Sequence, residues 1–283
     1  MTHLLCALLL VSSPALLARP AAIPAESVVV LYNSREADSK SLARHYARVR
    51  AIPEDNLVGL PMPPDEEISR EQFDEKIRDP LRKLFEARGW WERPEGADGQ
   101  TQPVSLNRRV LVTMRGVPYK IARTPETISG NQLEKRPFAP DPKGNESSVD
   151  SELSLLGVEK YAIAGQINNP YFRQDESVMD FSDASFLVVG RIDGPSLAIC
   201  KRMIDDARAV EESGLWGMAY LDLARKGEGY ELGDQWLEKI AGMNREVGIP
   251  TVIDRHPDTY VTNYPMSHAA LYYGWYSHHR SGP

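Results

Sequence analysis

Residues 109–120 read R-V-L-V-T-M-R-G-V-P-Y-K, an apolar run that ends abruptly in R-G-V-P. The aliphatic residues at 110–112 are contiguous rather than alternating with polar ones. This pattern predicts a strand covered on both faces, as in a parallel sheet packed between helix layers. Gly116 relaxes the backbone and Pro118 has no N–H to donate, so the strand should end there. Arg115 is therefore expected at the carboxyl end of a central strand, the edge where open α/β sheets bind ligands.

Other apolar runs of strand length alternate with helical patterns along the chain. Strands are expected at 27–32, 56–60, 186–190, 217–222, 251–254 and 269–276, and helices near 39–50, 69–88, 148–157, 195–207 and 232–247. This alternation predicts an α/β fold, a doubly wound, mostly parallel sheet with helices on both faces and long irregular loops. We expect a single α/β domain over 26–283, truncated at the C-terminal end, because no later element would cover the strand at 269–276.

Local signals support several of these elements. Ser69 and Gln72 form a capping-box pattern, and Pro80 inside the following apolar stripe should kink the helix. Cys200 falls on the apolar face of its helix, which favours a small core residue over a nucleophile. The tract at 115–148 is too long for an ordinary connection and is either a functional lid or disordered. The cleanest helical stripe consists of Leu232, Trp236, Ile240, Met243 and Val247.

Composition and the first residues bear on location and partners. The net charge is −7 and the chain has no cluster of five or more Lys or Arg, which excludes a typical nucleic-acid binder. Residues 1–18 contain no Asp, Glu, Lys or Arg, and an apolar block at 4–11 is followed by Ser-Pro-Ala. This pattern predicts a signal peptide over 1–18 and an exported, periplasmic or extracellular protein. The alternative, a membrane anchor, needs about 20 apolar residues, so no stable membrane span is expected in the mature chain.

Charged side chains follow several of the expected strands or begin the helix that closes the long tract. Four carboxylates are candidates for a catalytic acid, base or metal ligand: Asp150, Glu152, Asp222 and Asp254. Four further residues are candidates for ligand binding: Arg115, Arg191, Asp193 and His256. The same charges are alternatively structural, since acidic residues complement helix starts and buried ion pairs support long loops.

Seven short motifs are spread over nearly all of the mature chain and are specific when taken together. They are V-L-Y-N-S-R (30–35), R-G-V-P (115–118), S-V-D-S-E-L (148–153), N-P-Y (169–171), R-I-D-G-P (191–195), G-D (233–234) and Y-Y-G-W (272–275). With these motifs the chain resembles an uncharacterised family of exported bacterial proteins that has no assigned activity. Members of that family usually continue past Y-Y-G-W, which agrees with the truncated look of the C-terminal end.

A second resemblance concerns Gly190-Arg191, at the end of an expected strand and ahead of a helix. It is similar to a feature of gingipain-type cysteine peptidases, whose sheet is caspase-like. Those enzymes need a His and a Cys at successive strand ends, and no cysteine stands at an expected strand end here. The resemblance therefore implies a fold without the catalytic dyad. The chain has no G-x-x-x-x-G-K, G-x-S-x-G, H-E-x-x-H or C-x-x-C motif, so no cofactor and no metal is assigned.

Two functions fit these observations. One is an exported, hydrolase-like enzyme with its site at the carboxyl ends of the strands, which the gathering of charged residues at that edge favours. The other is a non-catalytic envelope or ligand-binding protein on the same scaffold, which the absence of a nucleophile or metal motif favours. A small-molecule or peptide ligand fits both, and the sequence does not indicate an oligomeric state.

Overall fold

The computed structural model describes residues 23–92, 105–124, 144–158, 161, 163, 169, 171–172, 185–227, 229–261 and 263–275. Most of the long tract expected at 115–148 lies outside these residues. The chain divides into two compact units, Met1–Asp205 and Asp206–Pro283, and each is described by itself. Parallel sheets with helices confirm the predicted α/β class. The expected single domain over 26–283 stays a prediction.

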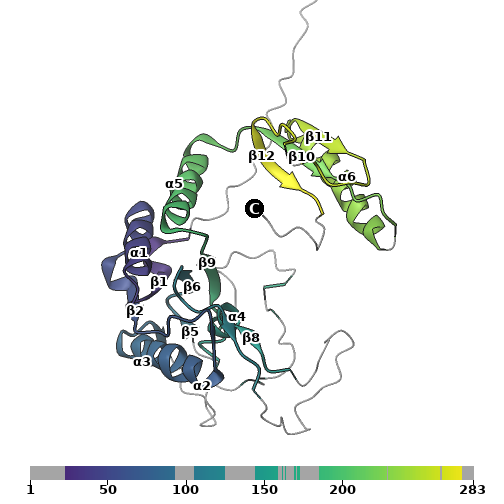
Figure 1. The fold of residues 1–283 in the computed structure, drawn as a ribbon. Helices are drawn as coiled ribbons and strands as arrows, with labels where there is room; N and C mark the ends of the chain where they lie inside the picture. Colours follow the sequence, from purple (N-terminus) through teal and green to yellow (C-terminus); the bar gives the residue numbers. More distant parts are fainter. Residues whose placement is uncertain are drawn as a thin grey trace, which may run out of the picture. The chain divides into compact units, whose positions relative to one another are not determined.

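The first unit is built on a four-stranded, all-parallel sheet with the strand order β2-β1-β6-β9 (Figure 1). Its strands are β1 (Val28–Asn33), β2 (Leu57–Leu60), β6 (Val110–Met114) and β9 (Val188–Ile192). In the register, Leu111 pairs with Val29 on one side and Val189 on the other. All five residues of β6 are buried, which confirms the central strand predicted from the contiguous aliphatic run.

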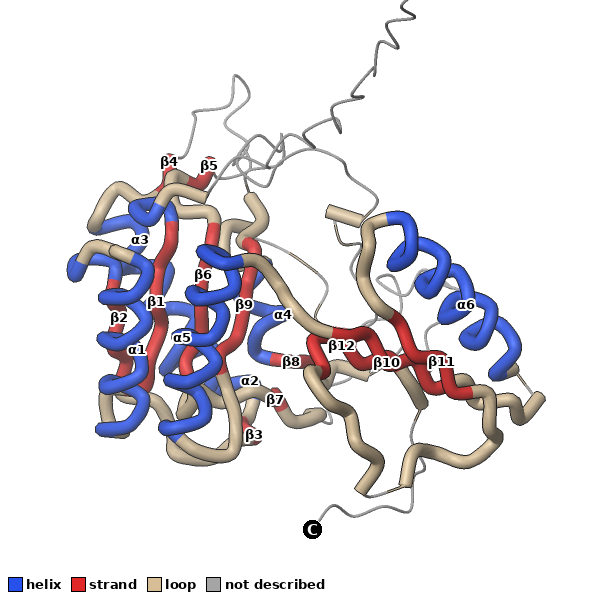
Figure 2. The backbone as a smooth tube through the Cα atoms, turned by 90° about the horizontal axis from the view of Figure 1, so that it is seen from above, coloured by secondary structure: helices blue, strands red, loops and turns tan. Residues whose placement is uncertain are grey.

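Helices cover both faces of this sheet. On one face lie α1 (Ala37–Arg50) and the start of α5 (Leu197–Ser213), side by side in Figure 2 and joined by a Lys201 Nζ to Ser41 Oγ hydrogen bond of 3.0 Å. The free thiol of Cys200 is fully buried there, as predicted. On the other face lie α2 (Arg70–Phe73), the π-helical turn η3 (Asp74–Arg78), α3 (Asp79–Ala87) and α4 (Val149–Ser154).

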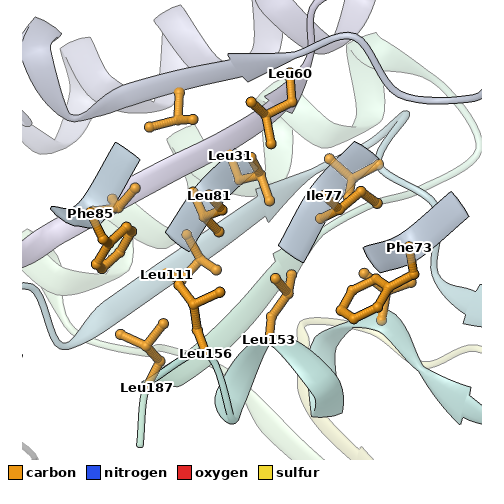
Figure 3. Packing of buried hydrophobic residues seen from close by; sticks show 14 of the residues in the cluster. Leu31, Leu60, Phe73, Ile77, Leu81, Phe85, Leu111, Leu153, Leu156 and Leu187 are labelled. Carbon is orange, nitrogen blue, oxygen red and sulfur yellow. The ribbon is translucent and has the colours of Figure 1, made fainter. Parts of the chain in front are cut away.

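The α2-η3-α3 segment shows how its sequence signals act. Ser69 accepts a hydrogen bond from the backbone of Gln72, whose side chain accepts one from the Ser69 N–H, which confirms the capping box. A π-helical turn precedes Pro80, which falls in the first turn of α3, where its missing N–H is tolerated. The inward stripe is fully buried against the sheet (Figure 3): Phe73, Ile77, Leu81 and Phe85.

Short elements complete the first unit. A small sheet with the strand order β3-β7-β8 joins β3 (Glu67–Ile68), β7 (Lys120–Ile121) and β8 (Ser147–Ser148), and a two-stranded ribbon joins β4 (Trp91–Glu92) and β5 (Ser105–Leu106). The 3-10 turns η1 (Ala25–Ser27) and η2 (Glu54–Asn56) precede β1 and β2. Within the described part of the chain, no helix has the length and apolar character that a membrane crossing requires.

The second unit has its own parallel sheet with the strand order β11-β10-β12. Its strands are β10 (Met218–Asp222), β11 (Thr251–Asp254) and β12 (Ala269–Tyr273). The sequence predicted a single sheet that includes the strand at 217–222, where Leu221 lies. That prediction is wrong, because β10 hydrogen-bonds to β11 and β12 and to no strand of the first sheet. Apolar runs identify parallel strands but do not state which strands pair.

The helix α6 (Tyr230–Glu246) packs Leu237 and Ile240 against the apolar residues of the second sheet. The predicted apolar stripe is not this inward face. Four of its five members are exposed, at fractions of 54% to 69%: Leu232, Trp236, Met243 and Val247. The helix faces the sheet with residues 237, 240, 241 and 244, so Ile240 alone belongs to both rows. The strongest periodicity in this segment therefore marks a solvent-exposed row of the second unit.

Candidate functional site

A pocket of about 380 Å³ lies at the carboxyl edge of the first sheet. Each of the four strands contributes the segment that follows it, which is the arrangement expected for ligand binding in an open parallel sheet. The lining residues are Glu36 after β1, Pro64, Asp65 and Glu66 after β2, Arg115 to Tyr119 after β6, and Asp193, Gly194 and Pro195 after β9. The pocket includes two of the residues predicted to bind a ligand, Arg115 and Asp193.

Arg115 is held by its backbone and by one side-chain nitrogen. Its N–H donates to the carbonyl of Ile192 at 2.8 Å, and its Nε donates to the carbonyl of Gly194 at 3.0 Å. Its two terminal nitrogens have no partner among the described residues. The guanidinium is therefore fixed in place while its fork of donors stays available to a ligand.

Four carboxylates line the same pocket. Glu66 accepts a hydrogen bond from the hydroxyl of Tyr119 at 2.7 Å, and Asp193 accepts one from the Gly194 N–H at 2.7 Å. The side chains of Glu36 and Asp65 make no hydrogen bond or ion pair with another described residue. With four carboxylates against one guanidinium, the lining has an excess of negative charge.

Asn33, the last residue of β1, connects the loops that form the pocket. Its side chain is fully buried and links the ends of three strands. Its Nδ2 donates to the carbonyls of Pro63 at 3.3 Å and Gly116 at 3.1 Å, and its Oδ1 accepts from the N–H groups of Arg35 and Met62, both at 3.1 Å. A buried amide with all these contacts holds the pocket loops in one geometry.

Gly116 is required where the R-G-V-P segment passes α1. Its φ is +91°, a conformation that side chains disfavour. A Cβ at this position would also overlap the Glu36 carboxylate. The glycine therefore lets the pocket loop approach that carboxylate directly.

Arg191 and Asp150 form a bidentate ion pair next to this loop. Arg191 Nε lies 2.7 Å from Asp150 Oδ2, and Nη2 lies 2.8 Å from Oδ1. The same guanidinium donates to the carbonyls of Val117 at 2.8 Å and Pro118 at 3.0 Å. The hydroxyl of Thr113 also donates to Asp150, at 3.2 Å. These contacts connect the pair to the pocket loop and fit the structural alternative, which stays a prediction.

Glu152 is also engaged within the protein. Its Oε1 lies 2.8 Å from Arg70 Nη2, and both side chains are less than a tenth exposed. The hydroxyl of Tyr161 donates to its Oε2 at 2.6 Å. Burial raises the pKa of Tyr161 above its usual range, and the negative charge of Glu152 adds to that effect. Glu152 therefore belongs to a buried network and does not line the pocket.

The remaining candidates lie in the second unit. Asp222 and Asp254 are register partners at the carboxyl ends of β10 and β11. Asp222 is fully buried, and burial raises its pKa, an effect that the nearby Tyr260 N–H partly opposes. Asp254 Oδ1 accepts the N–H of His256 at 3.0 Å, and the His256 side chain is exposed. Whether all eight predicted residues converge on one site stays a prediction, since they belong to two units.

Sequence reasoning missed Glu36, Asp65 and Asn33, although each stands in or just after an expected strand. In the described ranges, no three His, Cys, Asp or Glu are grouped so that they could hold a metal ion. Cys200 lies inside α5. Its burial raises the pKa of its thiol, and the negative charge of Asp193 raises it further.

Comparison with protein-family models, curated proteins and solved structures returns no match.

Proposed function

We propose that the chain is an exported ligand-binding protein and that the pocket of the first unit takes a small zwitterion, an amino acid or a short peptide. One observation carries this proposal. The pocket contains an arginine, Arg115, whose terminal nitrogens have no partner among the described residues. It also contains two carboxylates, Glu36 and Asp65, that likewise have no partner among these residues. Its expected export rests on the charge-free apolar start at 1–18.

The chemistry of the lining matches the two ends of such a ligand. A guanidinium fork binds a carboxylate through two parallel hydrogen bonds, which suits Arg115 as the anchor for the acidic end. Glu36 and Asp65 would accept hydrogen bonds from the ammonium end. The pocket volume of about 380 Å³ is in the range of small-molecule sites.

The surroundings of the pocket favour binding because they are fixed before a ligand arrives. Asn33 holds the strand ends and Arg191 holds the carbonyls of Val117 and Pro118. A loop that is already ordered costs less conformational entropy when it binds.

The hydrolase-like alternative has less support at this site. Two of its four candidate acids, Asp150 and Glu152, are engaged in ion pairs with Arg191 and Arg70. The described residues that line the pocket include no Ser, Thr, Cys, His or Lys that would act as a nucleophile or as a neutral base. Hydrolysis stays a prediction.

The test is isothermal titration of the full chain with a panel of amino acids and dipeptides. For any compound that binds, its N-acetyl and C-amide derivatives are titrated next. We expect each derivative to bind about tenfold more weakly or worse, because each removes one charged contact.

Variants of the pocket assign the binding to its residues. Arg115→Met and Asp65→Asn should each weaken binding about tenfold or more, because each also removes a charged contact. Glu54→Gln, an exposed carboxylate on η2 outside the pocket, should leave binding unchanged and is the matched control. The proposal is wrong if no zwitterion in the panel binds the folded protein, or if the pocket variants bind like the control.

A further inference from the structure

The second unit buries a carboxylate that lacks a full set of partners. Asp222, the last residue of β10, has an exposed fraction of 0%. Its Oδ2 accepts one long hydrogen bond, 3.4 Å, from the hydroxyl of Tyr272. The Tyr260 N–H is close enough to the carboxylate to lower its pKa, but Oδ1 is buried and makes no hydrogen bond of normal geometry with a described residue. Buried carboxylate oxygens are normally satisfied, so this one indicates a missing donor.

The neighbouring charges increase the need for a cation. Asp254 lies beside Asp222 in the register, and its negative charge raises the pKa of Asp222 further. The arginines nearest to these aspartates in sequence, Arg225 and Arg255, both contact Glu238 instead, at 3.9 and 3.0 Å. Neither is paired with Asp222.

A third acid, Asp234, also lies near Asp222, but its own oxygens already have hydrogen-bond donors. The charge of Asp234 also raises the pKa of Asp222. The two carboxylate oxygens of Asp234 already accept hydrogen bonds from the N–H groups of Ala224, at 2.8 Å, and Arg225, at 3.0 Å. The oxygen in need of a donor is therefore that of Asp222.

Aromatic rings surround the same carboxylates. The ring centroid of Tyr260 lies 4.3 Å from that of Tyr264 and 6.4 Å from that of Tyr272. The Tyr260 hydroxyl is buried and also has no partner among the described residues. Tyr264 and Tyr272 are 38% and 50% exposed, so solvent reaches the edge of the cluster.

Rings of this kind bind cations through their faces. Such a contact occurs in the second unit, where Lys226 Nζ lies 3.6 Å from the ring centroid of Trp275. A hydrated metal ion would not use tyrosine faces, and no grouping of three suitable ligands occurs in the described residues. An organic cation uses both the rings and the carboxylates.

We propose that Asp222, Asp254 and the rings of Tyr260, Tyr264 and Tyr272 bind an alkylammonium group. Asp222 Oδ1 accepts a hydrogen bond from the ammonium N–H, and the Tyr260 hydroxyl oxygen accepts a second. The alkyl carbons rest on the tyrosine faces. The ligand must therefore carry at least one N–H, which distinguishes a primary or partly methylated amine from a quaternary one.

The test is ligand-observed saturation-transfer NMR on the full chain, with methylammonium and tetramethylammonium chloride as probes at constant ionic strength. Methylammonium should bind saturably and tetramethylammonium about tenfold more weakly, because it has no N–H to donate. Asp222→Asn should weaken methylammonium binding about tenfold or more. This variant removes a buried charge and is expected to fold. Circular dichroism is the check that it does.

Two controls separate this site from other sources of signal. Asp258→Asn removes an exposed carboxylate from the loop after β11 and should not change methylammonium binding. Methylammonium held in the pocket of the first unit would be displaced by any zwitterion that binds there and would persist in Asp222→Asn, so the two proposals fail independently. Equal affinity in wild type and Asp222→Asn, tighter or equal binding of tetramethylammonium, or no saturable binding of either probe would overturn the inference.

Discussion

Arg191 and Asp150 meet through two hydrogen bonds although they are 41 residues apart in the sequence. One belongs to β9 and the other to the first turn of α4, and the guanidinium also holds the carbonyls of Val117 and Pro118. A single side chain thus joins a strand end, a helix start and the pocket loop. The sequence placed both residues among the functional candidates. Their contacts in the structure fit a supporting role, which stays a prediction.

Substitution of Asp150 tests that role. Asp150→Asn should lower the free energy of unfolding by about 1–3 kcal/mol, because Arg191 loses a charged acceptor in a partly buried place. Urea denaturation measures the change. Glu212→Gln breaks an exposed pair with Arg208 and should change stability by less than about 1 kcal/mol. Unchanged stability together with lost ligand binding would instead make Asp150 a functional residue.

Glu152→Gln should be more damaging. It leaves Arg70 buried with an uncompensated charge, which costs about 3–5 kcal/mol. The double variant Arg70→Met, Glu152→Leu removes both charges and should recover part of the loss. Chemical denaturation of the three proteins gives the comparison. A single variant as stable as the wild type would show that the pair is not shielded from water.

Leu111→Ala tests the central strand. The side chain is fully buried under α3 and its neighbours, so its removal leaves a cavity and should cost about 2–5 kcal/mol. Leu215→Ala is the control, because Leu215 is 51% exposed and its truncation should change stability by about 0.5 kcal/mol or less. Equal effects in a denaturant melt would place β6 at the surface.

Asp222 should make the stability of the protein depend on pH. Burial raises its pKa in the folded state, so between the ordinary value of about 4 and the raised value the folded protein binds more protons than the unfolded chain. Stability from this group is therefore present below about pH 4 and is lost as pH rises through the raised pKa.

The comparison is between wild type and Asp222→Asn in urea melts from pH 4 to pH 8. The advantage of the asparagine variant should grow with pH through that window and then level off. A stability difference that stays constant with pH, or that grows as pH falls, would contradict the raised pKa.

Much of the architecture was predictable because local rules determine it. The contiguous aliphatic residues of β6 and the capping box at Ser69 act through burial and backbone hydrogen bonding, which neighbouring residues determine. Strand partners were not predictable, and Leu221 was assigned to the wrong sheet. On α6, apolar spacing identified a helix but not the face that packs, since Trp236 is 61% exposed.

The site was predicted in part, for a similar reason. Strand ends located Arg115 and Asp193 in the pocket because the topology of parallel sheets brings such ends together. The engagement of Glu152 depends on Arg70, 82 residues away, and no spacing rule indicates that distance. Asn33 was missed because an asparagine just after an apolar run is also typical of an ordinary turn. Nothing in that sequence pattern shows that its amide is buried and hydrogen-bonded to three loops. Export and the resemblance to an uncharacterised exported family stay predictions.

Gly116 approaches Glu36, a residue that is distant in the sequence. A Cβ at 116 would take the space of the Glu36 carboxylate, and although that flexible side chain could move aside, the positive φ of residue 116 disfavours any side chain there. Related sequences should therefore keep glycine at 116 even where residue 36 is shorter than glutamate. A comparison of related sequences tests this without any biochemical assay.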